Sequence, residues 1–337
     1  MSLYGEFALL AVVVAAAGAF LATSADAIAD VTRLSRLLVG SLLLAAATSL
    51  PELTVDVAAV RQGAPDLAVG DLFGSSLMNL LILAVVDLAQ RSGRRMLSRE
   101  AAAHALPATL GIALTGLAGI AVLSAGDLPH VSFLGAGGWS WAILVAYLLG
   151  SRLVFLDQRI AARTLADAGT VTTTFHPPSS VGRLAIPLTT FAAAAAVLWF
   201  TGPRLAHVAA RLADQSGLGG TFVGTTLVAL TTSLPELVTA IVAVRAGAYD
   251  LAIGNTFGSN AFNMVIFLPL DMAHDGSLFT AVAPSHALTA FAVVVATAVA
   301  VLGQLYRIEG RIPLCEPDSL LVMLIVVGAL LLIYRLS

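Results

Sequence analysis

Lysine is absent from this chain of 337 residues, and all 17 of its basic residues are arginine. Charged residues of either sign make up only 11% of the sequence, and the single cysteine, Cys315, has no partner in the chain for a disulfide. A net charge of −3, with the arginines near the ends of apolar segments, gives no basic surface for nucleic acid. The sequence also has no P-loop and no H-E-x-x-H motif, so ATP-driven pumping and zinc proteolysis lack support. We therefore expect a protein that is not an enzyme and has no cofactor.

What the chain has in abundance is apolar surface. Hydrophobic residues make up 58% of it, and its mean hydropathy is +0.94, well above the range of ordinary soluble domains. A helix of about 20 residues crosses the ~30 Å hydrocarbon layer of a bilayer. The sequence predicts an integral membrane protein with ten spans, near residues 4–25, 37–60, 66–88, 101–124, 135–156, 184–201, 217–244, 250–271, 282–305 and 318–335.

The arginines predict how the spans are oriented. With the N-terminus outside, only Arg61, Arg204, Arg211 and Arg335 lie on the outer side, and the other 13 lie inside. This bias predicts both termini outside, in the plasma (inner) membrane. The first segment lacks a basic leader and carries Glu6, so we expect a retained span rather than a cleaved signal.

Two stretches of the chain are copies of each other. Residues 47–79 align without a gap to residues 231–263, a shift of 184 positions, with 19 identities in 33. Each copy places a proline and a glutamate inside an apolar segment, which is costly at membrane depth. The repetition therefore favours a shared site over two accidents.

The number of spans between the copies fixes their relative direction. Five predicted spans separate equivalent points, and because five is odd the two copies cross the membrane in opposite directions. We predict an all-α membrane protein of about ten transmembrane helices in two inverted-topology five-helix repeats, residues 1–156 and 184–337, joined by a cytoplasmic linker, residues 157–183. Inverted repeats with interrupted helices are typical of secondary transporters, whose site lies between the repeats near the midplane.

Oxygen ligands cluster in the second and seventh spans. Pro51 cannot donate a hydrogen bond to the carbonyl four residues earlier, so that carbonyl gains a free acceptor. Thr48, Ser49 and Glu52 share a face of the helix with it. The second copy repeats the set with Thr232, Ser233 and Glu236. Such hard oxygen ligands match Ca²⁺, Na⁺ or Mg²⁺ rather than zinc or copper.

The third and eighth spans supply a second wall. In each copy a serine and an asparagine lie four residues apart and present a hydroxyl and an amide oxygen on one face: Ser75 and Asn79, then Ser259 and Asn263. Glycines at the same spacing, at positions 70 and 74 and again at 254 and 258, remove side-chain bulk and let a neighbouring helix approach closely.

The doubled pattern resembles the α-repeat of the sodium/calcium exchangers, within the cation/calcium antiporter superfamily, over nearly the whole chain. The resemblance implies that Glu52 and Glu236 are the acidic ligands of a central Ca²⁺ site. It also implies that the neighbouring hydroxyl and amide residues bind Ca²⁺ and Na⁺: Thr48, Ser49, Ser75, Asn79, Thr232, Ser233, Ser259 and Asn263.

The first copy departs from the family pattern in its acids. Asp71 replaces the first asparagine of the motif, which the second copy keeps as Asn255, and Asp56 stands where the second copy has Ala240. We include Asp71 among the candidate metal ligands. Ionised, the extra acids favour a divalent ion or a higher Na⁺ requirement; protonated, they could couple transport to H⁺.

These observations predict an antiporter that exchanges Ca²⁺ for Na⁺ by alternating access, in which the first and sixth spans slide across the duplicated core. An H⁺-coupled exchanger of Ca²⁺ or another divalent cation is the alternative, and an ion channel or an ion sensor is a further one. The glutamates could instead be structural carboxylates that cap broken helices, and the serines and asparagines could only join helices. For Asp66 and Asp250 we expect a role at the start of a helix.

Overall fold

The protein is almost entirely helical in the parts that the computed structural model describes, residues 2–32, 34–89, 104–124, 132–167, 181–216, 229–305 and 317–336. The only strands in those residues are the antiparallel pair β1 (Ser132–Phe133) and β2 (Ala136–Gly137). Eight of the described helices are long and apolar enough to cross a membrane, and a shorter apolar helix covers Asp318–Ile333. The predicted all-α membrane architecture is confirmed.

The first half contains five spans. The first is α1 (Leu3–Thr32), and the second is built from four pieces, α2 (Arg36–Leu38), the π-helix η1 (Val39–Leu44), α3 (Ala45–Thr48) and α4 (Leu50–Arg61). The third to fifth spans are α5 (Pro65–Ala89), α6 (Ala105–Ser124) and α7 (Gly138–Asp167). The first part of the predicted linker, residues 157–167, is therefore still helical, and residues 168–180 lie outside the described residues.

The second half repeats this order. It begins with α8 (Val181–Ser216), followed by α10 (Ala229–Thr232), α11 (Leu234–Arg245) and α12 (Tyr249–Ala273). A short helix α13 (Leu278–Ala281) precedes α14 (His286–Leu305) and α15 (Pro317–Leu336). The start of the predicted seventh span, residues 217–228, lies outside the described residues.

Both copies of the motif interrupt their helix at the same place. The break is at Ser49, with φ −84° and ψ 10°, and at Ser233, with φ −79° and ψ 5°. Pro51 and Pro235 are the second residues of α4 and α11. A backbone N–H in the first turn has no acceptor within the helix, so proline loses no helical hydrogen bond there. The predicted interruption is thus present, and it falls two residues before each proline.

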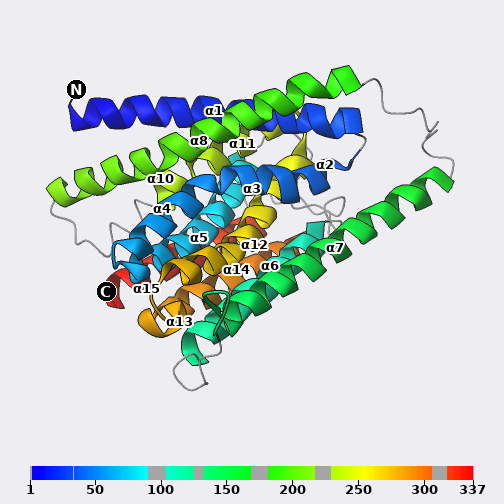
Figure 1. Ribbon diagram of the computed structural model, residues 1–337. Coiled ribbons are helices and arrows are strands. Elements are labelled where there is room, and N and C mark those ends of the chain that lie inside the picture. Colours follow the sequence, from blue (N-terminus) through cyan, green and yellow to red (C-terminus); the bar gives the residue numbers. More distant parts are fainter. Residues whose placement is uncertain are drawn as a thin grey trace.

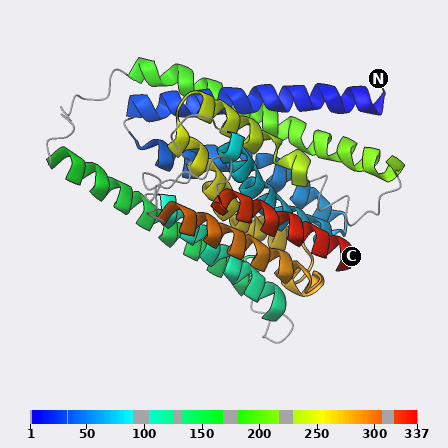
Figure 2. The same ribbon diagram turned by 180° about the vertical axis from the view of Figure 1, so that it is seen from behind.

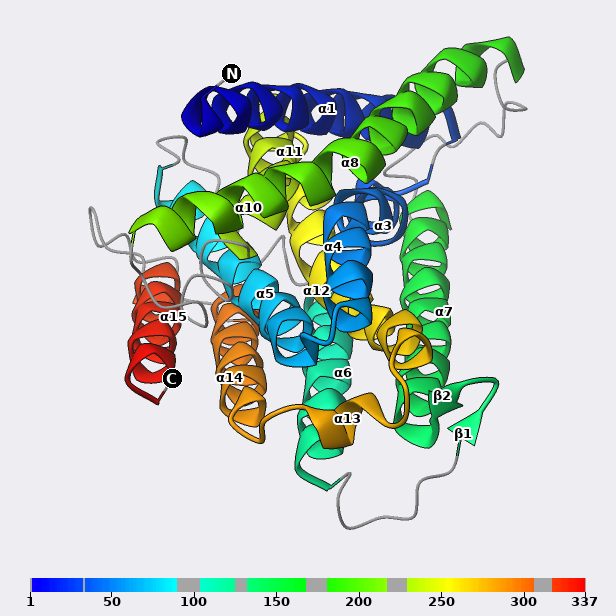
Figure 3. The same ribbon diagram turned by 60° about the vertical axis from the view of Figure 1, so that its left-hand side comes forward.

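The helices form two layers. Figures 1 and 3 show α1 and α8 lying side by side across one face of the remaining helices, which form the larger bundle. In that layer α1 packs on α11 and α8 packs on α4, so each first helix of a half rests on the interrupted helix of the other half. Seen from behind in Figure 2, the start of α1 and the end of α15 lie at the same end of the bundle, as an even number of crossings requires.

Two histidine–aspartate contacts show that the halves are inverted. Asp66 in the first turn of α5 contacts His286 at the start of α14, with Oδ1 2.9 Å from Nε2. Its repeat equivalent, Asp250 in the first turn of α12, contacts His104 beside the start of α6, at 3.2 Å. Each pair joins the third span of one half to the fourth span of the other. Asp66 and Asp250 do begin helices, and they also fasten the two halves together.

The glycines of α12 allow the second span to approach closely. A methyl group on Gly254 would lie 2.7 Å from the carbonyl oxygen of Leu37, and one on Gly258 would collide with the backbone of Ser41. The predicted packing role of Gly254 and Gly258 is therefore confirmed. Positions 221 and 225, the repeat counterparts of Leu37 and Ser41, lie outside the described residues.

The buried carboxylate of Asp271, at the end of α12, joins three other parts of the chain. Asp271 accepts hydrogen bonds from Gly137 N and Ser140 Oγ, both at 2.6 Å, and from Leu278 N at 2.9 Å. Its repeat equivalent, Asp87 at the end of α5, accepts one from Ser319 Oγ near the start of α15, at 2.7 Å. In each half, the aspartate at the end of the third span thus accepts a hydrogen bond from the start of the fifth span of the other half.

We expect Asp271→Ala to lower the free energy of unfolding by at least about 3 kcal/mol, because three buried donors lose their acceptor at about 1–3 kcal/mol each. Thermal unfolding of the purified protein in detergent measures the loss. Asp275→Ala, at an exposed aspartate four residues on, is the matched control. Equal melting temperatures for the two variants would show that the Asp271 contacts contribute little.

Candidate functional site

The two interrupted helices meet the third span of the opposite half in the middle of the protein. Thr48 Oγ1 lies 3.3 Å from Ser259 Oγ, and the repeat-equivalent atoms, Thr232 Oγ1 and Ser75 Oγ, lie 3.2 Å apart. Residues 211 and 157 positions apart in the chain are thereby brought into contact. The polar centre is therefore built from both halves in equal measure.

A second pair of hydrogen bonds follows the same symmetry. Thr48 Oγ1 donates to Asn255 Oδ1 at 3.3 Å, and Thr232 Oγ1 donates to Asp71 Oδ1 at 3.3 Å. Positions 71 and 255 are equivalent in the repeat, so one threonine meets an amide and the other a carboxylate. The two contacts differ chemically only in their acceptor, which is Asp71 in the first copy and Asn255 in the second.

Every candidate ligand predicted from the sequence lies in the protein interior. The exposed fraction is at most 2% for Thr48, Ser49, Glu52, Asp71, Ser75, Asn79, Thr232, Ser233, Glu236, Ser259 and Asn263. Burial of so many polar side chains at membrane depth is expensive unless each finds a partner. Their ion-binding role stays a prediction. The hydrogen bonds divide ten of them into two groups, and the eleventh, Asp71, stands apart because it accepts from Thr232 and also contacts the carboxyl of Asp56.

The first group has its oxygens engaged. The hydroxyl groups of Thr48, Ser75, Thr232 and Ser259 bond one another across the repeat, and Ser259 Oγ also donates to Glu236 Oε1 at 3.3 Å. These hydroxyls orient the site. Each hydroxyl oxygen still has a lone pair that can coordinate an ion, because it has two acceptor sites.

The second group has buried oxygens with no hydrogen-bond partner. There are seven such atoms: Ser49 Oγ, both oxygens of Glu52, Asn79 Oδ1, Ser233 Oγ, Glu236 Oε2 and Asn263 Oδ1. Native proteins leave few buried polar atoms unpaired, so seven of them among the candidate ligands call for an explanation. All seven are hard acceptors, and Ca²⁺ takes six to eight oxygen ligands. We name these six residues the oxygen cage.

Among the described residues, no basic side chain acts on Glu52 or Glu236. Glu52 interacts electrostatically with Glu236 and Asp71, and Glu236 also interacts with Asp71. A buried carboxylate without a counter-charge costs several kcal/mol, so the negative charge of the site favours a bound cation. No group of three or more His, Cys, Asp or Glu side chains forms a metal centre in the described residues. Neutral oxygens must therefore supply most ligands, which suits Ca²⁺ and Na⁺ better than zinc.

An asparagine at the edge of the cage, Asn260, was not among the candidate ligands. Asn79 Nδ2 donates to Asn260 Oδ1 at 3.0 Å, and Asn260 Nδ2 donates to the Ser76 carbonyl at 3.2 Å. This leaves Asn79 Oδ1 free for an ion and fixes which way its amide points. The position of Asn260 in the duplicated motif could have indicated this role.

Two glycines that sequence reasoning passed over touch the interrupted helices. Gly202 of α8 lies against Pro51, and a methyl group there would come within 2.6 Å of the proline Cβ. Gly18 of α1 lies against Pro235, where a methyl group would be 3.3 Å from the carbonyl oxygen. The two glycines are 184 residues apart, the same shift as the motifs. The repeat therefore extends to the helices that cross the cage.

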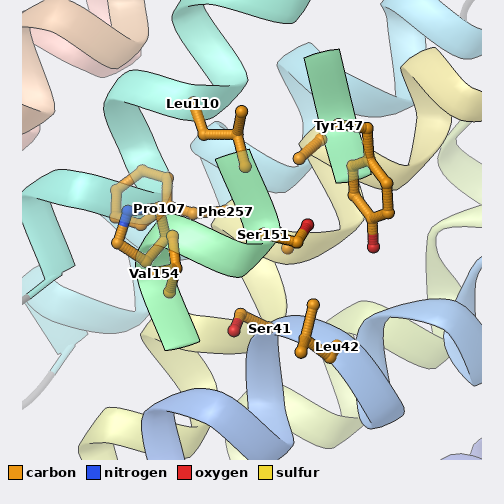
Figure 4. A pocket seen from close by; sticks show the side chains of 10 residues that line it. Ser41, Leu42, Pro107, Leu110, Tyr147, Ser151, Val154 and Phe257 are labelled. Carbon is orange, nitrogen blue, oxygen red and sulfur yellow. The ribbon is translucent and has the colours of Figure 1, made fainter. Parts of the chain in front are cut away.

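A separate small pocket lies between η1, α6, α7 and α12 (Figure 4). Its polar groups include the hydroxyls of Ser41, Tyr147 and Ser151, and the rest of its lining is mostly apolar, as at Leu110 and Phe257. No carboxylate lines it, so it has no charge to hold a cation. The oxygen cage remains the stronger candidate.

Comparison with known proteins agrees with the duplication. The family described as Sodium/calcium exchanger protein matches residues 2–156 and 186–334. Inner membrane protein YrbG of Escherichia coli (strain K12) is 31% identical over 236 residues, which cover 69% of this chain and 68% of that protein. Putative antiporter CaxA of Alkalimonas amylolytica is 28% identical over 247 residues, 72% of each chain.

A third relative is more similar over a shorter stretch, and a solved structure shares the whole fold. Sodium/calcium exchanger MaX1 of Methanosarcina acetivorans is 43% identical over 75 residues, 20% of this chain and 21% of that one. The structure of the sodium-calcium exchanger NCX_Mj superposes with a TM-score of 0.68 at 16% identity and covers 98% of both chains. With its two matched repeats, the chain belongs to the sodium/calcium exchanger family.

Proposed function

We propose that this protein is a secondary antiporter that binds Ca²⁺ and Na⁺ in turn at the oxygen cage and exchanges one for the other across the membrane. Membership of an exchanger family supports cation antiport. The observation that carries the choice of ions is the cage itself. Two buried glutamates and four neutral side chains offer seven unpartnered oxygens, which matches the coordination number of Ca²⁺.

Competition for the same oxygens couples the two ions. Glu52 and Glu236 together carry two negative charges, which one Ca²⁺ or two Na⁺ neutralise. Either load offsets the cost of keeping the carboxylates in a low-dielectric interior, whereas the empty cage does not. A carrier that moves readily only when loaded couples the two gradients, and this distinguishes an antiporter from a channel.

Movement of α1 and α8 would expose the cage to one side at a time. These two helices form their own layer and meet the motif prolines of the opposite half at Gly18 and Gly202. Glycine leaves a smooth helix surface, so the layer can slide over the interrupted helices without side chains locking into them. We place the protein in the plasma (inner) membrane with both termini outside, as the arginine distribution predicts.

Flux measurements in sealed vesicles test the coupling ion. We expect an outwardly directed Na⁺ gradient to drive ⁴⁵Ca²⁺ uptake into proteoliposomes, and an H⁺ gradient of the same size to drive much less. Uptake that follows the H⁺ gradient and ignores Na⁺ would replace the proposal with H⁺-coupled exchange. Ca²⁺ entry without any counter-ion would identify a channel.

The glutamates provide the second test. Glu52→Gln or Glu236→Gln keeps the shape of the side chain and removes one of two charges, so we expect Ca²⁺ affinity to fall by at least about 100-fold, or about 3 kcal/mol. Titration of the purified protein with Ca²⁺ measures this. Asp157→Asn, at an exposed acid on α7, is the control. Near-normal affinity in either glutamine variant would refute the assignment of the cage.

The sliding contact gives the third test. Gly202→Val puts bulk against Pro51, so we expect exchange to slow by at least about tenfold while equilibrium Ca²⁺ binding persists. Gly116→Val is the matched control, because it adds the same side chain to a helical glycine of α6 with open space around it. Exchange at the wild-type rate in Gly202→Val would show that this contact does not move.

A further inference from the structure

The β1–β2 hairpin, which leads into α7, places two large apolar side chains on the surface of the described protein. Phe133, at the end of β1, is 63% exposed, and Leu134, in the turn, is 67% exposed. None of the residues 132–137 is charged. Figure 3 shows the hairpin beside the start of α7, at the edge of the molecule. An uncharged, apolar surface in this position indicates a contact with lipid or with a partner.

The turn of the hairpin holds a leucine in a backbone conformation that does not suit it. Phe133 pairs with Ala136, so Leu134 and Gly135 form a two-residue loop, and their φ angles are +51° and +82°. Leu134 is the only described residue other than glycine with a positive φ. Such loops favour Asn-Gly or Asp-Gly, because asparagine and aspartate tolerate a positive φ better than apolar residues do. A polar residue would therefore suit this turn better if water surrounded it.

Contacts at two points fix the direction of the hairpin. The indole N–H of Trp141, in the first turn of α7, donates to the Phe133 carbonyl oxygen at 2.8 Å. The two aromatic rings pack edge to face, with their centroids 5.7 Å apart. At the base of the hairpin, Asp271 accepts from Gly137 N and Ser140 Oγ, both at 2.6 Å. The hairpin is therefore held against α7 and α12, and its turn projects from them.

The exposed surface of the hairpin continues along α7. Helical spacing places Val145 one turn after Trp141, and Leu148 and Leu149 about two turns after it. These three side chains are 52%, 56% and 60% exposed, on a helix that is long and apolar enough to cross a membrane. Because the Phe133 ring packs on Trp141, one apolar stripe runs from the hairpin along α7. On a membrane span such a stripe faces lipid, and the hairpin extends it.

We propose that the β1–β2 hairpin is a membrane anchor, which inserts Leu134 at the boundary between lipid headgroups and acyl chains, with Phe133 and Trp141 at the same level. The partner is a phospholipid bilayer, in the leaflet where α7 begins, and in the proposed orientation this is the outer leaflet. The hydrocarbon core does not accept open strand edges, so the hairpin stays at its boundary. Amphipathic aromatic rings are enriched at that level. The anchor does not depend on which ions are exchanged.

The anchor acts on the helices that hold the oxygen cage. Asp271 joins the hairpin to α12, and α12 carries Ser259 and Asn263. The bundle that contains α7 and α12 is thereby fixed in depth at one surface of the bilayer. The layer of α1 and α8 then moves against a bundle that keeps its level in the membrane.

Spin labels test whether the turn lies in lipid. Leu134→Cys, in a Cys315→Ser background, is labelled with a nitroxide and reconstituted into phosphatidylcholine vesicles. We expect the label to collide more with oxygen, which concentrates in lipid, than with a water-soluble nickel chelate. Leu149→Cys is the lipid-facing control, and Gln62→Cys, in the exposed turn after α4, is the aqueous control. If the label at position 134 behaves like the label at position 62, the turn is in water, open to a protein partner, and the proposal is overturned.

A second variant separates lipid contact from turn chemistry, because the two have opposite effects on stability. In water, Leu134→Asn would stabilise the protein, since asparagine suits the positive φ of the turn. In lipid, the same substitution removes an apolar side chain from the acyl chains. We expect Leu134→Asn to melt at a lower temperature than the wild-type protein in phosphatidylcholine nanodiscs. An unchanged or higher melting temperature would contradict the anchor, whatever the flux measurements show about the transported ions.

Discussion

Burial of Glu52 and Glu236, with no basic partner in the part of the chain that the structure describes, is the constraint on which the rest of this structure depends. In a bilayer such charges are tolerated only where protein surrounds them and an ion can offset them. The halves meet this requirement together. Each interrupted helix brings its threonine to the third span of the opposite half, and the threonine–serine contacts hold that crossing in register. The histidine–aspartate pairs secure the same arrangement at the two ends.

The duplicated motif was enough to predict the inverted fold and the residues that gather at its centre. It placed the interruptions near Pro51 and Pro235, and it singled out Gly254 and Gly258 as packing positions. These features depend on local sequence, since a proline breaks a helix and a glycine removes bulk whatever lies nearby. An acid and hydroxyls spaced three and four residues apart likewise share a face by helix geometry alone.

What the sequence could not provide is the choice of partners across the halves. Gly202 meets Pro51, and Asp271 meets Ser140, through contacts between residues more than a hundred positions apart. Nothing in local periodicity specifies them, because an apolar helix in a membrane has many faces of similar composition. Polar composition also did not indicate that residues 157–167, the first part of the predicted linker, continue the helix α7. A helix satisfies its own backbone, so it can extend past the apolar layer with a polar surface.

The crossing contacts between the halves bear on how the chain is made. Thr48, Ser75, Asp66 and His104 all find their partners in the second half. A ribosome delivers the first five spans before any of those partners exists. For that interval the acids of α4 and α5 lie in a membrane with half of their enclosure missing, and water, lipid headgroups or an insertion factor must shield them. The boundary between the repeats therefore divides the sequence, while the unit that folds is the whole chain.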